Sequence, residues 1–222
     1  MQSSWRPDWL ATIIQGLPRV ATLSGHMRPT VRIESVAALD SALMMSLGVH
    51  GVIWDVDGTL MRRHGTAVAP QLVDAFARLL ADSTLRHVVL SNCDERRFAQ
   101  LASIFPTIPI IRVYDGDNGL VVRRRLGDDD TGPGVGDSHH EPRALRKPNV
   151  AMVGAALDAL GSMSPANALM VGDQYLTDIA PANMLGVRTA KVKTVEPQSF
   201  PVMVRVLQLA ERLLYRLSPS KS

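Results

Sequence analysis

The sequence predicts an α/β domain in which helices cover both faces of a parallel β-sheet. Short apolar runs alternate with segments of helical periodicity along most of the chain, as they do in folds of this class. The length of 222 residues is that of one domain of ordinary size. With 46% apolar and 20% charged residues, the chain can bury a core large enough for such a sheet.

Five segments have the pattern of buried strands. Each is a short apolar run bounded by polar or turn-forming residues, which is typical of strands that are covered on both faces. In chain order the predicted strands are residues 51–56, 87–91, 109–113, 168–171 and 188–192.

Three segments between these runs repeat apolar residues with the period of an α-helix. They cover residues 72–80, 98–105 and 150–160. Pro70 stands in the first turn of the first of them, where a proline is well tolerated. Helices therefore alternate with the predicted strands.

The rest of the chain divides into regions around this pattern. Residues 1–48 are expected to form a helical lead-in that packs on the core, with a helix over residues 36–47. Residues 49–197 form the domain that contains the sheet. Within it, residues 114–144 are rich in Gly and Asp and lack a clear period, so they are predicted to be a long flexible loop. Residues 198–222 are expected to form a C-terminal helix and tail.

The C-terminal helix has a strongly amphipathic pattern. Its apolar residues share one face, and Arg205, Arg212 and Arg216 share the other. Two interpretations remain open: the apolar face packs on the core, as in most such helices, or it lies in the interface of an anionic membrane. The same two interpretations apply to Trp5 and Trp9, which are either core residues or anchors in a membrane interface.

Composition and charge exclude several classes of protein. The single cysteine, Cys93, rules out an intramolecular disulfide and any multi-cysteine metal site. Lys plus Arg, at 24, barely exceeds Asp plus Glu, at 21, so no nucleic-acid partner is expected. No apolar run approaches about 18 residues, and the N-terminus lacks the pattern of a signal peptide. The expected location is therefore the cytoplasm or the inner face of a membrane, or the mitochondrial matrix in a eukaryote.

Two carboxylates stand at the carboxyl end of the first predicted strand. Asp55 and Asp57 are two residues apart, so strand alternation places them on the same side, and Gly58 frees the backbone to turn. Two carboxylates so close repel each other unless a cation lies between them. Carboxylate oxygens are hard ligands that suit Mg²⁺. The pair therefore predicts a magnesium site.

Further polar residues accompany the later strands. Ser91 ends the second strand and Asn92 follows it, and they offer a hydroxyl and an amide to phosphate oxygens. Lys147 stands just before a helix, where its ammonium group can neutralise an anion. Asp173 and Asp178 follow the fourth strand. Because ligands of parallel α/β sheets collect at the carboxyl ends of the strands, these groups together predict metal-assisted phosphoryl transfer with a carboxylate nucleophile.

The same groups carry a family resemblance. The order DVDGT, SN, Lys147 and GDQYLTD resembles the four motifs of the haloacid dehalogenase (HAD) superfamily, which has a Rossmann-like fold, and it spans about residues 51–192. The resemblance implies that Asp55 attacks phosphorus and becomes an aspartyl phosphate. It implies that Asp57 is the general acid on the leaving oxygen and then the general base on water.

The resemblance also implies how metal and phosphate are bound. Asp55, the backbone carbonyl of Asp57, and Asp173 would hold Mg²⁺. Asp178 would be either a further ligand or a support for Lys147. The phosphoryl group would be bound by residues of the same motifs: Gly58, Thr59, Ser91, Asn92 and Lys147. The gaps between the motifs leave no room for a large folded cap, so we expect a capless member with an open site.

Segments outside the motifs narrow the resemblance. PTVRIESVAALDSALMMSLGVHGVIWDVDGTL and VGDQYLTDIAPANMLGVRTAKV resemble subfamily IIIA, and within it the phosphatidylglycerophosphate phosphatase branch. This implies a membrane-lipid substrate on the way to phosphatidylglycerol and cardiolipin. The chain departs from the branch at Gly58, where Asn is common, and in the insertion at 114–144. The alternatives are a HAD phosphatase for a soluble sugar, nucleotide or other small phosphoester, and a phosphate-binding module without turnover.

Overall fold

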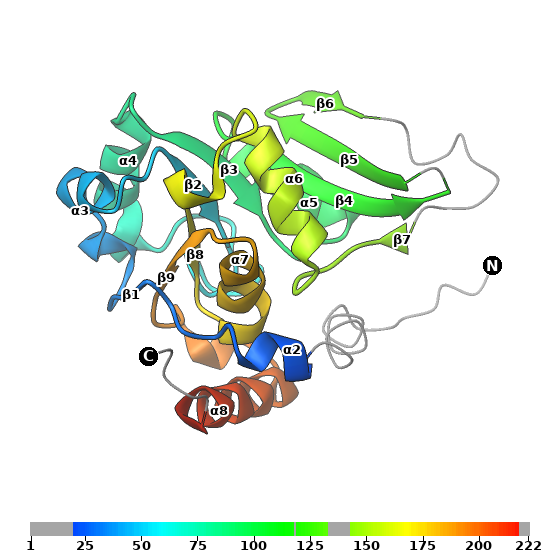
Figure 1. Cartoon of the computed structure of the whole chain (residues 1–222). Helices are drawn as coiled ribbons and strands as arrows, with labels where there is room; N and C mark the ends of the chain where they lie inside the picture. Colours follow the sequence, from blue (N-terminus) through cyan, green and yellow to red (C-terminus); the bar gives the residue numbers. More distant parts are fainter. Residues whose placement is uncertain (1–19, 118, 133–142, 218–222) are drawn as a thin grey trace.

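A nine-stranded sheet forms the centre of the molecule. The computed structural model describes residues 20–117, 119–132 and 143–217 (Figure 1). The strand order is β1-β9-β8-β2-β3-β4-β5-β6, and β7 pairs with β4. The first six strands in this order run parallel: β1 (Val31–Arg32), β9 (Arg188–Lys191), β8 (Ala168–Gly172), β2 (Gly51–Trp54), β3 (Arg86–Leu90) and β4 (Ile110–Gly116). The prediction of a mostly parallel α/β sheet is therefore confirmed.

The five predicted strands are β2, β3, β4, β8 and β9, and their apolar runs fill two cores. Along β2, Val52 and Trp54 lie in the core on one face of the sheet, and Ile53 lies in the core on the other face. A strand that is buried on both sides needs apolar residues at every position. This is why these strands were recognisable as short continuous apolar runs.

Helices cover both faces, as predicted. One core contains the apolar side chains of α4 (Val73–Ala81) and α5 (Glu95–Ile104), and the other contains those of α6 (Val150–Ala159). Figure 1 shows α6 in front of the sheet and α5 behind it. The Asp94 side chain begins α5 by accepting a hydrogen bond from the Arg97 backbone N–H at 2.7 Å. Between β2 and β3 the described chain contains only α4 and a short 3₁₀ turn, so no cap domain is inserted there.

The lead-in packs on the sheet core, but the helix predicted over 36–47 is two separate pieces. A 3₁₀ turn (Val36–Ala38) comes first, and α3 (Ser41–Ser46) follows. The break has a local cause, because the Asp40 side chain accepts the Leu43 backbone N–H at 2.7 Å and starts a new helix. The short helix α2 (Val20–Ser24) precedes them, and Trp5 and Trp9, expected as core residues or interfacial anchors, lie outside the described residues.

The prediction of a flexible loop over residues 114–144 is wrong for much of that segment. β4 continues to Gly116 and forms an antiparallel hairpin with β5 (Gly119–Leu126), followed by β6 (Asp129–Thr131) and later by β7 (Arg143–Ala144). The positions of β5 alternate between exposed and half-buried, with arginines among both kinds. A strand of this kind lacks the continuous apolar run by which the buried strands were recognised.

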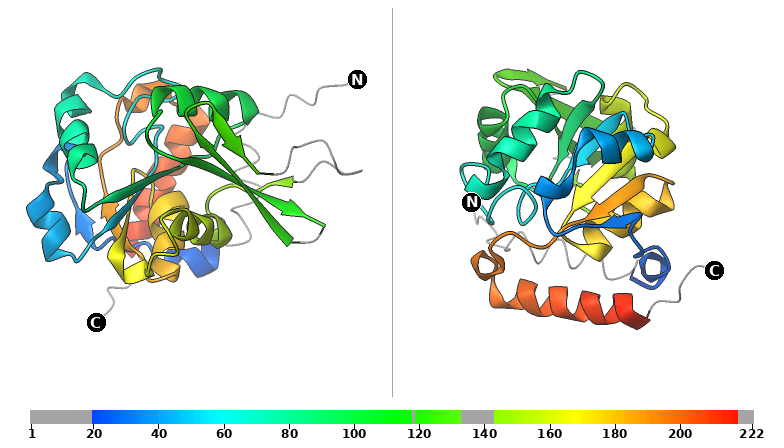
Figure 2. Two further views of the ribbon diagram at one scale, coloured as in Figure 1. Left: turned by 90° about the horizontal axis from the view of Figure 1, so that it is seen from above. Right: turned by 90° about the vertical axis from the view of Figure 1, so that its left-hand side faces the viewer.

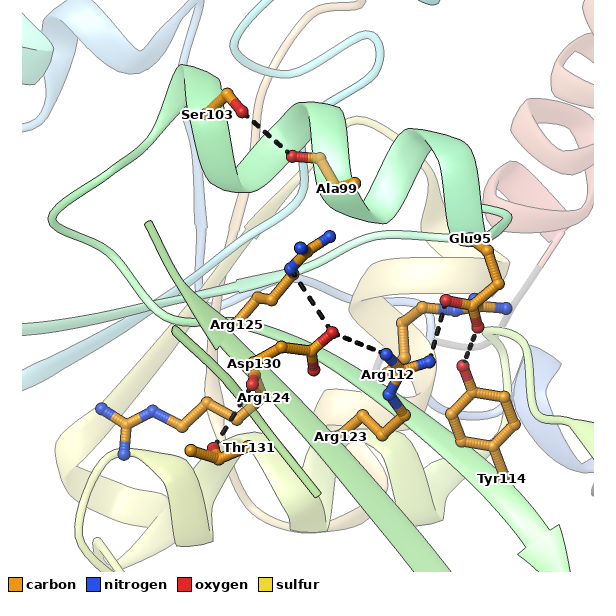
Figure 3. Close-up of polar contacts among 10 residues, drawn as sticks. All are labelled: Glu95, Ala99, Ser103, Arg112, Tyr114, Arg123, Arg124, Arg125, Asp130 and Thr131. Carbon is orange, nitrogen blue, oxygen red and sulfur yellow. Dashed lines mark hydrogen bonds and ion pairs between the residues drawn. The ribbon is translucent and has the colours of Figure 1, made fainter. Parts of the chain in front are cut away.

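Ion pairs hold this hairpin to α5 (Figure 3). Arg123 donates to Glu95 at 2.9 Å and to Asp130 at 2.6 Å, and Glu95 also accepts from Arg112 and Tyr114. Arg123 and Arg125 of β5 are thus paired with Asp130 of β6, the neighbouring strand.

The C-terminal helix α8 (Val202–Leu217) lies along one side of the molecule (Figure 2). It contacts the π-helical turn Tyr175–Ile179, which follows β8. Among the helices in the described part of the chain, none has the length and apolar character needed to cross a bilayer.

Candidate active site

The candidate site lies where β2 and β8 end side by side. Trp54 of β2 pairs with Val171 of β8, so the residues that follow, Asp55 and Asp173, leave neighbouring strands at the same edge. Both carboxylates are buried. Burying two carboxylates at one edge is costly unless cations or hydrogen-bond donors lie beside them.

Three acids converge at this edge. Asp55, Asp173 and Asp178 are all buried, and one oxygen of each lies within 4.8 Å of the others. Neither oxygen of Asp173 has a hydrogen-bond partner of normal geometry, although the Thr194 hydroxyl is close enough to lower its pKa slightly. Burial, together with the charges of Asp55 and Asp178, raises the pKa of Asp173 to about 8. Three crowded carboxylates, one of them without a hydrogen bond of normal geometry, fit a hard divalent cation such as Mg²⁺.

Lys147 provides the positive charge within the cluster. Its Nζ donates to Asp55 Oδ1 at 2.5 Å and to Asp178 Oδ1 at 2.7 Å. Burial alone would lower the pKa of this lysine, but the charges of Asp178 and Asp55 outweigh that effect and raise it. For Asp178, burial is the larger influence and raises the pKa to about 6 against the attraction of Lys147. Asp178 thus touches the lysine and also borders the possible metal position.

The Asn92 side chain fixes the loop that carries Lys147. Its Oδ1 accepts the Lys147 backbone N–H at 2.7 Å, and its Nδ2 donates to the Lys147 carbonyl at 3.1 Å. This pairing was not predicted from the sequence, where Asn92 was assigned to phosphate. Ser91, at the end of β3, is buried at the same edge.

Gly58 and Thr59, the two residues after Asp57, shape the cluster. Thr59 donates its hydroxyl to Asp55 Oδ2 at 2.8 Å, so both oxygens of Asp55 are held. Gly58 has a φ of +93°, and a Cβ there would lie 2.7 Å from Asp173 Oδ2. Only glycine allows the backbone to approach Asp173 so closely in this conformation.

Asp57 lies beside the cluster and is bonded to a residue that sequence reasoning missed. Its carboxylate accepts from Arg97 Nη2 at 2.8 Å, while Arg97 Nη1 donates to the Gly65 carbonyl and to Gln100, both at 2.7 Å. Arg97 is buried and comes from the first turn of α5. The sequence signal that could have identified Arg97 is its place in the first helical turn after the SN motif. The pair fixes the Asp57 carboxylate to α5, and Asp57 is not among the three clustered acids.

The motif resemblance implies proton transfer by Asp57, and for that role we expect Arg97→Met to lower kcat by roughly 10²-fold with little change in KM, because Asp57 would lose the group that orients it. Steady-state kinetics on a soluble phosphoester would measure this. Arg97→Lys should restore part of kcat, and the exposed neighbour Arg96→Met should behave as wild type. Thermal unfolding would show whether Arg97→Met stays folded at the assay temperature, so that a loss of kcat can be assigned to positioning rather than to unfolding. An unaltered kcat in Arg97→Met would contradict the expectation.

Two further charged residues near the cluster were missed. Lys191 ends β9 and lies 4.9 Å from the Tyr175 ring centroid, where its charge acts on Asp173. The rule of polar residues at strand ends, applied to the fifth strand, would have found it. Glu211 of α8 is buried and accepts the Leu176 backbone N–H. Burial raises the pKa of Glu211 to about 8. No local signal marked it, since it belongs to the polar side of an amphipathic helix.

Cys93 follows the SN motif but has the properties of a packing residue. It is buried in the core on the α4 and α5 face. Burial raises the pKa of its thiol to about 12, so the thiolate needed for nucleophilic chemistry is not formed at neutral pH.

Comparison with known proteins agrees with this geometry. The family model described as HAD-hydrolase-like matches residues 144–196, which carry Lys147, Asp173 and Asp178. The match supports the HAD superfamily. The matched segment leaves out β2 and β3, so a HAD-type role for Asp55 rests on its motif and on its place in the cluster.

The other comparisons add little. A search of curated proteins found no significant match. Among solved structures, the chain is similar to an uncharacterized protein from Listeria monocytogenes serotype 4b, with 15% identity and a TM-score of 0.42 over 76% of this chain and 99% of that one.

Proposed function

We propose that this protein is a Mg²⁺-dependent phosphomonoester hydrolase of the HAD type that works through an aspartyl phosphate. The observation that carries the proposal is the buried cluster in which Lys147 bridges Asp55 and Asp178 beside an unpartnered Asp173. Asp55, Asp173, the Asp57 backbone carbonyl and in addition Asp178 would hold the metal. When bound, Mg²⁺ would supply positive charge to the phosphoryl oxygens.

The chain's own residues would divide the chemistry. Asp55 is the nucleophile, and the hydrogen bonds from Thr59 and Lys147 hold its carboxylate in one orientation. Lys147 and Ser91 would bind the transferring phosphoryl group and spread its charge. Asp57, oriented by Arg97, would protonate the leaving oxygen and would then take a proton from the hydrolytic water.

For the substrate we propose phosphatidylglycerophosphate, and the support is the resemblance of the lead-in and of the GDQYLTD region to that branch. The absence of a cap between β2 and β3 in the described chain is compatible with a large substrate. A soluble sugar, nucleotide or other small phosphoester is the second candidate, because an open site would accept it equally. A phosphate-binding module without turnover is the third.

Phosphate release tests these candidates together. Phosphatidylglycerophosphate in mixed micelles would be compared with a panel of soluble phosphoesters, in Mg²⁺ and in EDTA. Preference for the lipid, lost in EDTA, is the expected result. Preference for a soluble ester would keep the chemistry and reject the lipid substrate. No release from any substrate would reject the hydrolase and leave the binding module.

We also expect Mg²⁺ to stabilise the fold more as pH rises. The pKa of Asp173 is about 8 in the folded chain against an ordinary 3.8, so between these values the metal-free folded state holds a proton that the unfolded state has lost. Stability of the metal-free protein should therefore fall as pH rises through this window. Bound Mg²⁺ needs the deprotonated carboxylate and removes the penalty.

Thermal unfolding in Mg²⁺ and in EDTA, at several pH values and matched ionic strength, would measure this effect. The increase in Tm caused by Mg²⁺ should be clearly larger at pH about 8 than at pH about 5, because at the lower pH the metal must displace the proton on Asp173. Asp173→Asn should remove most of the pH dependence. An equal or larger increase at the lower pH would show that the metal does not bind through Asp173.

A further inference from the structure

The apolar face of α8 is turned away from the protein. Of the twelve large hydrophobic residues that are exposed in the described chain, seven belong to this one helix. Leu213 is 58% exposed and Leu217 is 82% exposed. The seven are Val202, Met203, Val206, Leu207, Leu209, Leu213 and Leu217. A helix that contributes to folding by apolar burial would face the other way.

The side of α8 that docks carries its two buried polar residues, together with Leu214 and Tyr215, which pack against a small core around Tyr175. Gln208 and Glu211 are its buried residues, and Tyr215 is half-buried, a spacing of three and four residues that defines one helix face. Glu211 accepts the Leu176 backbone N–H, and the Tyr215 ring stacks on Tyr175 with centroids 4.3 Å apart. These contacts fix the helix and determine which side is presented outward. The interpretation in which the apolar face packs on the core is thus not the arrangement in this structure.

The charge on the outer surface of α8 has one sign. Arg205, Arg212 and Arg216 are exposed and lie along one flank of the apolar face. Glu211, the only acid in α8, is buried on the docking side. The exposed surface therefore combines a broad apolar strip with arginines and without carboxylates, and such a surface complements an anionic partner.

We propose that α8 is a peripheral membrane-binding element, whose outward apolar face inserts into the interface of an anionic lipid bilayer while its arginines contact lipid phosphates. Helices of this composition lie in the plane of the interface. A second copy of the chain fits this face less well than a bilayer does. Two such helices would bring their arginines together, and neither helix has an exposed acid to compensate. The proposal does not depend on the hydrolase chemistry.

Flotation of the full-length chain with vesicles tests this. The vesicles are phosphatidylcholine alone and phosphatidylcholine mixed with phosphatidylglycerol, at low and high salt. We expect the wild type to float with the anionic vesicles and much less with the neutral ones. The double variant Val206→Gln/Leu213→Gln should bind at least roughly tenfold more weakly, because it removes apolar area from the inserted face. Replacing the three arginines by Gln should weaken binding by roughly 10²-fold and remove its salt dependence.

Met45→Gln is the matched control, since Met45 is an exposed hydrophobic residue on α3 and should not affect flotation. Failure of the wild type to float with anionic vesicles overturns the proposal. A concentration-dependent dimer that Val206→Gln/Leu213→Gln disrupts, without vesicle binding, would identify a second copy as the occupant. A monomer that binds neither kind of vesicle would mean that another part of the chain covers the apolar face of α8.

The test separates this proposal from the proposed function. The α8 variants should retain hydrolysis of a soluble phosphoester, and Asp55→Asn should float as the wild type does. A wild-type chain that floats with anionic vesicles but releases no phosphate would reject the proposed function and leave the membrane-binding proposal standing. A wild-type chain that hydrolyses the soluble phosphoester but does not float would reject the membrane-binding proposal and leave the proposed function standing.

Discussion

Asp55→Asn is expected to reduce phosphate release by roughly 10⁴-fold or more, because an amide cannot form the aspartyl phosphate and nucleophile removal is among the most damaging changes to an enzyme. The fold should survive the change. Asn retains an oxygen that can accept from Thr59 or Lys147, and the substitution removes one negative charge from a cluster of three buried acids. The loss of activity should therefore appear without a loss of stability in EDTA.

Single-turnover and steady-state phosphate release would measure the loss, with thermal unfolding as the companion measurement. Asp74→Asn is the matched control, since Asp74 is an exposed aspartate in the first turn of α4 and should leave turnover unchanged. Acid quenching of the wild type during turnover should trap a phosphorylated chain, and Asp55→Asn should trap none. Turnover retained by Asp55→Asn would reject the aspartyl-phosphate mechanism.

The strands and the acidic cluster were predictable because the physics that determines them is local. Val52, Ile53 and Trp54 are apolar in succession because the two faces of β2 are both covered, and that pattern is visible in the sequence. Polar residues that follow such runs must lie at the carboxyl edge of the sheet. The convergence of Asp55 and Asp173 follows from the pairing of β2 with β8.

The features that were missed depend on contacts between distant segments. β5 is visible only through its pairing with β4, since its own residues alternate between half-buried and exposed positions rich in arginine. Arg97 reaches Asp57 across 40 residues of sequence, and Asn92 reaches Lys147 across 55. No local pattern encodes which side chain a buried cation or amide will meet.

The orientation of α8 illustrates the same limit most clearly. Amphipathicity determined which residues share a face, but not which face docks. The docking side is selected by the buried Glu211, which accepts a backbone N–H of the turn after β8, and by the stacking of Tyr215 on Tyr175. From the sequence alone, the default of an apolar face on the core was the stronger interpretation, and the structure reverses it.

Lys147→Met is expected to remove turnover and also to destabilise the metal-free fold by about 3–5 kcal/mol, the range found when one partner of a buried ion pair is removed. Methionine has a similar length but no charge, so Asp55, Asp173 and Asp178 would remain buried without the ammonium group that bridges two of them. Because burial already raises the pKa values of Asp173 and Asp178, the variant should regain stability by taking up protons as pH falls. Mg²⁺ should restore part of the loss at higher pH, since it supplies positive charge to the same oxygens.

Urea unfolding in EDTA and in Mg²⁺, across the same pH range, separates the two roles of this lysine. Lys193→Met is the matched control, because the Lys193 side chain is 73% exposed and its ion pair with Glu34 lies at the surface, where such pairs contribute about 0–1 kcal/mol. Lys147→Arg tests geometry, since it keeps the charge but brings a larger, planar group into a fully enclosed position. Equal stability of wild type and Lys147→Met in EDTA at high pH would mean that the three acids are not held together by this charge. The assignment of Lys147 as the cation that permits the acids to be buried side by side would then be wrong, whatever the variant does to turnover.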